Sequence, residues 1–224
     1  MSKALPMLPS AETLHPVRLP DGTLYPGSVF LKPAVADHPR VSVGEYTYYS
    51  TFDPLADAAQ YAARLFPYLS IGSPEKVIIG KFCQIAHGTR IITQTANHRM
   101  DGASTYPFAI IEDDRIGTYR STLPRGCDVE IGHDCWLCDG CTILPGARLG
   151  NGVIVGADAV VKGDVPAYAV VAGNPAKIVR MRFAPDEVEK MNHLAWWNWP
   201  IDKIAEHEAL IAGGSVDDLA RLAV

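Results

Sequence analysis

The residues best suited to chemistry in this 224-residue chain lie in the segment NHRMDG, at positions 97–102. The side chain of His98 changes charge near neutral pH and can therefore act as a general base. Asn97 and Asp101 lie beside it and could hold the imidazole in one tautomer. A solvated histidine in a surface loop is the alternative, and the spacing of these residues alone favours that alternative.

The segment 131–166 repeats every six residues, as IGHDCW, LCDGCT, ILPGAR, LGNGVI, VGADAV and VKGDVP. The first position of each hexad is aliphatic, and the fifth is small or β-branched. Neither an α-helix nor an ordinary strand has this period, whereas a chain that turns a corner once per hexad does. The repeat predicts a mainly-β fold, a left-handed parallel β-helix. Its packed interior leaves function to the outside, where the repeat is interrupted.

Cys135, Cys138 and Cys141 form a CxxCxxC run, whose spacing is compatible with zinc or an iron–sulfur cluster. The repeat favours another interpretation, because Cys135 and Cys141 occupy the inward fifth position, where thiols act as small hydrophobic groups. Cys138 falls at a corner of the prism. We therefore expect core cysteines and no metal.

The repeat also organises the rest of the chain. Three hexads, IGKFCQ, IAHGTR and IITQTA, occupy 79–96, and VGEYTY at 43–48 is expected to open the β-helix. We expect an N-terminal extension over 1–40, the β-helix over 41–182 and C-terminal helices over 183–224.

Two interruptions of the repeat are predicted to leave the prism. The segment 97–128 has no visible period of its own, and a long loop of this kind is usually functional, so it is expected to be an extruded active-site loop. The interruption 50–76 contains a short helical pattern formed by Ala58, Tyr61, Ala62 and Leu65.

Three features organise the C-terminal region. Pro185 is expected to start a helix, because proline suits the first turn, with Val188, Met191, Leu194 and Ala195 on its apolar face. Asp202 is expected to cap a second helix that ends near Leu210. The tryptophan-rich segment WWNWP, at 196–200, is expected to anchor these helices to the prism.

Composition excludes some function classes. The formal net charge of −5 argues against a nucleic-acid partner, which would require a basic face. No apolar run approaches the roughly 18 residues of a membrane span, and the first residues lack the apolar core of a signal peptide. A cytoplasmic protein without a membrane partner is expected.

Several motifs together resemble the xenobiotic acetyltransferases, which include the type B chloramphenicol and the streptogramin A (virginiamycin) acetyltransferases. The motifs are VGEYTYYS (43–50), IIGKFCQIAHGTRI (78–91), ANHRMDGASTYPF (96–108), IGHDCWL (131–137), VVAGNPAK (170–177) and WWNWP (196–200). They follow the family's order and spacing from about 41 to 205. The NHRMDG and TYPF motifs resemble the streptogramin branch more than the chloramphenicol branch.

This resemblance implies direct acetyl transfer from acetyl-CoA, as co-substrate, to the hydroxyl of a small molecule. His98 matches the family's catalytic histidine and would deprotonate that hydroxyl. No acyl-enzyme is needed when both reactants are held together, and no GxSxG nucleophile motif is present. The resemblance also implies a homotrimer with active sites between subunits.

The resemblance assigns cofactor-binding positions. Trp136, at an outward hexad position, would pack along the pantetheine arm, although an exposed tryptophan is more often an interface residue. Gly156 and Ala157 would let the arm approach the backbone. The motif formed by Gly173, Asn174, Pro175 and Lys177 would lie near the CoA nucleotide, with a solvated lysine as the alternative for Lys177.

Acceptor-binding positions follow in the same way, with plain loop packing as the alternative for each. They are Tyr48, Met100, Tyr106, Pro107 and Phe108. Three departures from the family pattern bear on the acceptor: Gln84 replaces a serine, Leu137-Cys138 replaces Ile-Gly, and the segment 109–126 is unlike that of the antibiotic-resistance enzymes.

Three other functions remain open. An acetyltransferase of the same fold could act on a sugar or another metabolite hydroxyl. A γ carbonic anhydrase-like metal enzyme would need three histidines, and the chain offers His98 and His133 with Cys138 in the third place. A scaffold without catalytic activity would lack CoA binding.

Overall fold

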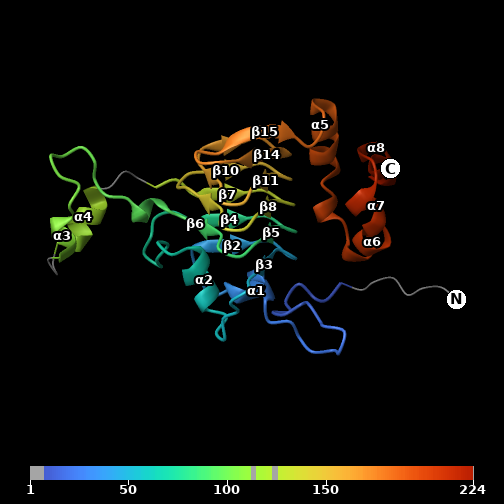
Figure 1. Cartoon of the computed structure of the whole chain (residues 1–224), viewed down its shortest axis with the longest axis horizontal. Helices are drawn as coiled ribbons and strands as arrows, with labels where there is room; N and C mark the ends of the chain where they lie inside the picture. The colour runs from blue at the N-terminus through green and yellow to red at the C-terminus, as the bar shows by residue number, and fades with distance from the viewer. Residues whose placement is uncertain (1–7, 112–114, 123–125, 224) are drawn as a thin grey trace.

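A computed structural model describes residues 8–111, 115–122 and 126–223. Most of its strands belong to one central prism, with the helices outside it (Figure 1). The strands are β1 (Ser28–Phe30), β2 (Val41–Val43), β3 (Tyr48–Ser50), β4 (Val77–Ile79), β5 (Gln84–Ile85), β6 (Arg90–Ile91), β7 (Val129–Ile131), β8 (Trp136–Leu137), β9 (Thr142–Ile143), β10 (Arg148–Leu149), β11 (Ile154–Val155), β12 (Val160–Val161), β13 (Asp164–Val165), β14 (Ala169–Ala172) and β15 (Lys177–Met181). The α-helices are α1 (Leu31–Ala34), α2 (Gln60–Leu65), α3 (Phe108–Ile111), α4 (Ile116–Thr122), α5 (Pro185–Leu194), α6 (Ile201–Glu206), α7 (Glu208–Gly213) and α8 (Val216–Ala220). Short 3-10 turns lie at η1 (Gln94–Ala96), η2 (Trp196–Asn198) and η3 (Arg221–Ala223).

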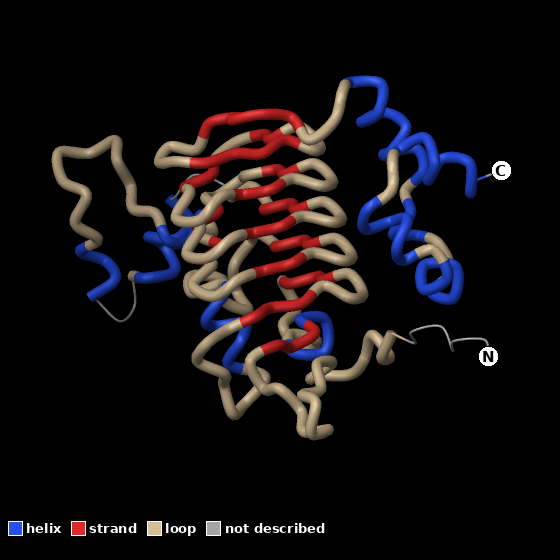
Figure 2. The backbone as a smooth tube through the Cα atoms, turned by 45° about the vertical axis from the view of Figure 1, so that its right-hand side comes forward, coloured by secondary structure: helices blue, strands red, loops and turns tan. Residues whose placement is uncertain are grey.

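The prism has three faces, each a sheet that runs along its axis (Figure 2). The large sheet has seven strands in the order β1-β3-β5-β8-β11-β14-β15, the middle sheet has five in the order β13-β10-β7-β4-β2, and the small sheet has three in the order β12-β9-β6. The chain visits middle, large and small sheets in turn, and strands of successive coils pair in parallel. Antiparallel strands β1 and β15 lie at the two ends of the large sheet. The predicted left-handed β-helix is confirmed.

The inside of the prism is filled by the side chains that the hexads predict. All six first-position residues and all six fifth-position residues of 131–166 are buried. Burial raises the pKa of the Cys141 thiol to about 12, and it raises that of Cys135 well above its ordinary value. These thiols are therefore packing groups, as expected. Cys138 lies half-buried at a corner.

No group of three metal-ligating side chains occurs in the described parts of the chain. The same parts contain no helix with the length and apolar character that a membrane span requires.

The loop at 97–128 leaves the prism at the corner between the small and middle sheets and projects from one side (Figure 1). The loop contains two helices that the sequence does not indicate, α3 and α4. Each helix is short, four and seven residues, so neither contains enough turns to show a clear apolar period in the sequence. In the other interruption, α2 forms where the short pattern predicts it and buries Tyr61, Ala62 and Leu65.

The C-terminal helices cover the corner between the middle and large sheets, on the opposite side of the prism from the loop (Figures 1 and 2). The ring of Trp196 lies 4.9 Å from that of Phe82, and Trp197 stacks on His133 at 5.1 Å. The expectation that WWNWP anchors these helices is confirmed. Helix α5 begins at Pro185 as predicted and directs Met191 into this contact.

The expected cap at Asp202 was wrong. Helix α6 begins at Ile201, with Pro200 in the N-cap position and no side-chain cap, so Asp202 lies in the first turn. An acidic residue in the first turn still interacts favourably with the helix dipole. The helical region is also divided at His207, whose backbone leaves the helical range, so α6 and α7 are separate helices.

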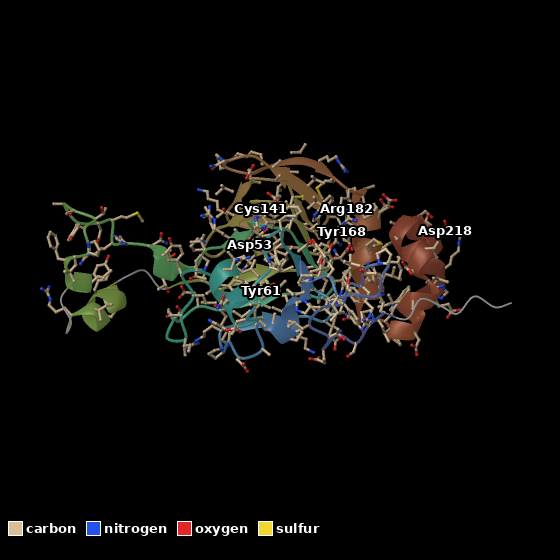
Figure 3. All side chains as sticks on the ribbon, turned by 60° about the horizontal axis from the view of Figure 1, so that its bottom comes forward. Asp53, Tyr61, Cys141, Tyr168, Arg182 and Asp218 are labelled. Atoms are coloured by element: carbon tan, nitrogen blue, oxygen red, sulfur yellow. The ribbon has the colours of Figure 1, made fainter. Side chains whose placement is uncertain are left out.

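A partly buried ionic cluster joins the prism to the segment that leads into α5. Arg182 donates a hydrogen bond to the Gly152 carbonyl at 2.7 Å and lies 3.7 Å from Asp134. Its guanidinium also lies over the ring of Tyr168 (Figure 3). Burial raises the pKa of Asp134 to about 6, although Arg182 opposes this shift. At neutral pH the fold therefore holds a carboxylate that burial disfavours.

We expect the substitution Asp134→Asn to remove a pH dependence of stability. A carboxyl group whose pKa is raised by folding stabilises the fold when protonated, and that contribution is lost as pH rises from 3.8 to about 6. The wild type should lose up to roughly 3 kcal/mol relative to the variant across this window. Urea unfolding of both proteins at equal concentration, from pH 4 to pH 7, measures the difference. Asparagine tolerates the left-handed backbone at this position (φ 54°). Parallel pH profiles would contradict the assignment.

Candidate active site

His98 lies on the incoming side of the loop, two residues after η1, and is exposed. Its Nδ1 lies 3.1 Å from the carbonyl oxygen of Thr105, and its ring meets the ring of Tyr119 edge-on at 6.5 Å. A carbonyl oxygen only accepts, so this hydrogen bond places the proton of the neutral imidazole on Nδ1 and leaves Nε2 as the basic atom. The arrangement supplies an oriented base.

The orienting partner of His98 differs from the one that the sequence suggests. Asp101 forms an ion pair with Arg99, which lowers the pKa of Asp101 through a hydrogen bond from the guanidinium. The backbone of Thr105 performs the role expected of Asn97 or Asp101. Sequence reasoning could not find this partner, because a backbone carbonyl belongs to every residue type.

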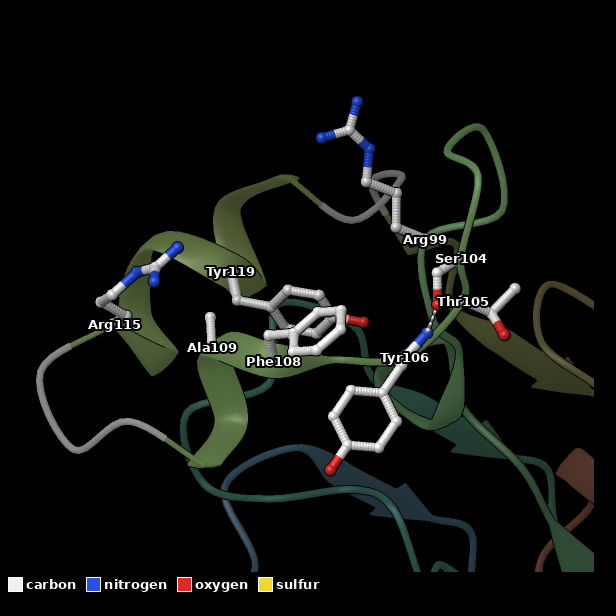
Figure 4. Close-up of a pocket in the computed structure, with 8 residues that line it drawn as sticks. All are labelled: Arg99, Ser104, Thr105, Tyr106, Phe108, Ala109, Arg115 and Tyr119. Atoms are coloured by element: carbon white, nitrogen blue, oxygen red, sulfur yellow. Dashed lines mark hydrogen bonds between the residues drawn. The ribbon is translucent and has the colours of Figure 1, made fainter.

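A pocket of about 260 Å³ is built entirely from the loop (Figure 4). It lies beside His98, because Thr105 and Tyr119, which contact the His98 ring, both line it. Its lining residues are Arg99, Ser104, Thr105, Tyr106, Phe108, Ala109, Arg115 and Tyr119. The predicted acceptor residues Tyr106 and Phe108 both line it, with ring centres 4.7 Å apart. Met100 and Pro107 do not line it. Tyr119 and Arg115, from the unusual segment 109–126, were not singled out by the sequence.

A second group of predicted residues lies on the prism. On the outer face of the large sheet, Tyr48 is in register with Gln84, Gln84 with Trp136, and Trp136 with Ile154. Trp136 is 46% exposed, whereas Tyr48 is half-buried and its pKa is raised by burial. Tyr48 thus lies in the row of Trp136 and not in the pocket of the loop.

The remaining cofactor-binding candidates follow the corner where the large sheet meets the small sheet. Gly156 and Ala157 directly follow β11, and Gly173, Asn174 and Pro175 follow β14 one coil further along. Lys177 begins β15 and is exposed. The structure therefore brings these residues together along one edge of the prism, beside Trp136.

The two groups are separate within one chain. The described contacts of His98 lie inside the loop, which leaves the prism at the corner between the small and middle sheets. The other candidates lie on the large sheet and its corner with the small sheet.

The candidate histidines of a metal enzyme do not come together. His133 lies at the corner between the middle and large sheets, where its Nδ1 accepts from the amide of Lys81 at 2.9 Å and its ring stacks on Trp197. Burial lowers its pKa. His98 is on the projecting loop, and Cys138 is at a third corner. Within one chain, the three residues that a carbonic anhydrase-like site would use therefore lie at different corners.

Comparison with known proteins identifies the family of the chain. Residues 128–163 match the family model described as bacterial transferase hexapeptide (six repeats). The chain is 40% identical over 197 residues to the virginiamycin A acetyltransferase of Staphylococcus aureus, which covers 86% of this chain and 85% of that protein. The chain belongs to the hexapeptide-repeat xenobiotic acetyltransferases.

Other relatives of this xenobiotic acetyltransferase are named for different substrate classes. It is 33% identical over 181 residues to a chloramphenicol acetyltransferase of Morganella morganii, across 80% of this chain and 85% of the relative. It is 39% identical over 148 residues to a probable macrolide acetyltransferase of Lysinibacillus sphaericus, across 65% of this chain and 82% of that protein. The enzyme is therefore an acetyltransferase with relatives named for chemically different acceptors.

Proposed function

We propose that this acetyltransferase transfers the acetyl group of acetyl-CoA to a hydroxyl group of a xenobiotic, either a streptogramin A or a chloramphenicol-like antibiotic. The observation that carries the proposal is the oriented base beside a loop pocket, in a chain 40% identical to a virginiamycin A acetyltransferase. A cytoplasmic location, where acetyl-CoA is made, is part of the proposal.

In the proposed reaction Nε2 of His98 takes the proton of the acceptor hydroxyl as its oxygen attacks the thioester carbonyl. The tetrahedral intermediate then collapses, the carbon–sulfur bond breaks, and the CoA thiolate leaves and takes up the proton. Direct transfer needs no covalent enzyme intermediate, because holding both reactants in place removes much of the entropic barrier. Thr105 keeps Nε2 available throughout by fixing the tautomer.

The donor half of the site is proposed to be the edge of the large sheet. Trp136 would cover the pantetheine arm, and the small residues Gly156 and Ala157 would allow the arm to approach the backbone. Gly173, Asn174, Pro175 and Lys177 would lie near the nucleotide. Tyr48, at the other end of the same row, would reach the acceptor together with Met100, Tyr106, Pro107 and Phe108.

Self-association into a homotrimer, with each site between two subunits, is the second part of the proposal. Two features support it. The loop exposes large apolar side chains, including Met100 at 76%, Phe108 at 64% and Ile111 at 68%, and such a patch is typical of a covered interface. The loop and the donor edge also lie apart within one chain.

Acceptor choice is tested by acetyl-CoA-dependent thiol release with virginiamycin M, chloramphenicol, and amino and neutral sugars. We expect turnover of virginiamycin M or chloramphenicol, because the loop pocket is lined by aromatic side chains that suit a bulky, partly apolar acceptor. Turnover of a sugar alone would move the function to metabolism. The absence of turnover with every acceptor would contradict both the xenobiotic and the sugar hypothesis.

The substitution His98→Ala should reduce kcat by 10²–10⁴-fold, the usual contribution of a general base, which is an order-of-magnitude expectation. Acetyl-CoA affinity, measured by calorimetry, should stay within about threefold because the proposed donor residues lie elsewhere. His193→Ala, at an exposed position of α5, is the matched control and should retain wild-type activity. Equal activity of the His98 variant and this control would refute the base assignment.

Mixed trimers test the position of the site between subunits. His98→Ala lacks the base, and Ala157→Trp blocks the donor edge, so each variant alone should be inactive. In a mixed trimer, one of the three sites combines an intact base with an intact donor edge, so random mixing should restore about a quarter of wild-type activity. Co-refolding the two variants and assaying thiol release measures this. A mixture without activity would place the whole site within one chain.

A further inference from the structure

Glu75 is a buried carboxylate at the root of the loop, and the reaction proposed above does not use it. It lies two residues before β4 and is only 1% exposed. Apart from cysteines and tyrosines, it is the one ionisable side chain in the buried class among the described residues. A carboxylate in such a place is costly unless hydrogen bonds compensate for the lost water. Its partners therefore show what the residue holds in place.

The hydrogen bonds of Glu75 reach the incoming stem of the loop. Its Oε1 accepts from the backbone amide of Thr95 at 2.8 Å and from the Thr95 hydroxyl at 2.7 Å. Burial alone would raise the pKa of Glu75, but these bonds hold it below its ordinary value. The hydroxyl of Thr95 also meets the hydroxyl of the buried Ser73 at 3.2 Å. Thr95 is thus fixed from two sides.

The other oxygen of Glu75 faces the outgoing stem. A Cβ atom placed on Gly126 would lie 2.9 Å from Oε2, so the carboxylate packs directly on the backbone of this glycine. The neighbouring residue adds a second contact to the same stem, because the amide of Lys76 donates to the carboxylate of Asp128 at 2.7 Å. Residues 75 and 76 therefore contact both stems where the loop leaves the prism.

We infer that Glu75 is a positioning residue, which ties the two stems of the loop together and thereby sets where His98 lies. Thr95 is part of η1, and His98 follows it by three residues. Three residues span at most about 10 Å, so the orientation of η1 determines the direction in which the chain carries the imidazole. The inference rests on the proposed role of His98.

The first test compares Glu75→Ala and Glu75→Gln, with Glu130→Ala as the control at an exposed position of β7. Virginiamycin M is the acceptor. Glu75→Ala should lower kcat about 100-fold, the cost of misplacing the imidazole of His98 by roughly 1 Å. The KM for acetyl-CoA should stay within about twofold of the wild-type value, because the donor edge is untouched. Glu75→Gln keeps an oxygen for Thr95 and should restore kcat to within about fivefold of wild type.

Hydrogen exchange supplies a readout that does not need turnover. The backbone amides of 94–99 should exchange at least tenfold faster in Glu75→Ala than in the wild type, since local opening of the stem is no longer opposed. Amides of β8 and β11 should be unchanged. Gly126→Ala disturbs the contact of Glu75 with the outgoing stem. It therefore provides the same test if Glu75→Ala does not fold.

The outcomes separate the two hypotheses. If His98→Ala is active, the proposed role of His98 as the base fails, while hydrogen exchange still decides whether Glu75 holds the stem. If His98→Ala is inactive but Glu75→Ala and Gly126→Ala turn over at the wild-type rate, only the positioning role is wrong. A Glu75→Gln variant as impaired as Glu75→Ala would also overturn it, because charge and not the contact with Thr95 would then matter.

Discussion

Parallel backbone pairing between successive coils is the interaction on which the rest of this structure depends. Most strands have only two or three residues, too few to be stable alone, so each acquires its hydrogen bonds from the coil before and the coil after. The buried first and fifth positions of the hexads fill the space between the three sheets. A prism packed in this way has no interior site, and the pairing places outward side chains of successive coils in straight rows.

The two halves of the candidate site differ in how they are held. The row that contains Tyr48 and Trp136, and the corner that contains Gly156 and Gly173, take their positions from the backbone ladder itself. The described part of the loop has no such ladder, and its geometry comes from individual contacts. Thr105 holds the ring of His98, and Glu75 meets both stems at the root. A substitution on the row therefore acts locally, whereas one at the root moves everything beyond it.

The sequence was sufficient to predict the β-helix and the residues that fill its interior. Alternation within hexads identified Cys135 and Cys141 as interior residues, and Pro185 identified the start of α5, because both are local rules of backbone geometry. It failed where the deciding partner is distant or belongs to the backbone. Thr105 and Tyr119 beside His98 have no signature, and neither does the contact of Glu75 with Thr95, twenty residues later. Short helices such as α3 and α4 also escape detection, since a period needs several turns to appear.

Under the proposed function, the division of the site between the prism and the loop explains how one fold serves different acceptors. The donor edge is built from repeats, which must keep their inward residues to pack and their corners to turn, so it has little freedom to vary. The pocket beside His98 is built from 99–119, outside the repeat, where no ladder constrains the side chains. Tyr119 and Arg115 from the unusual segment 109–126 line that pocket. Acceptor choice can therefore change through the loop alone, provided that its root keeps the imidazole in place.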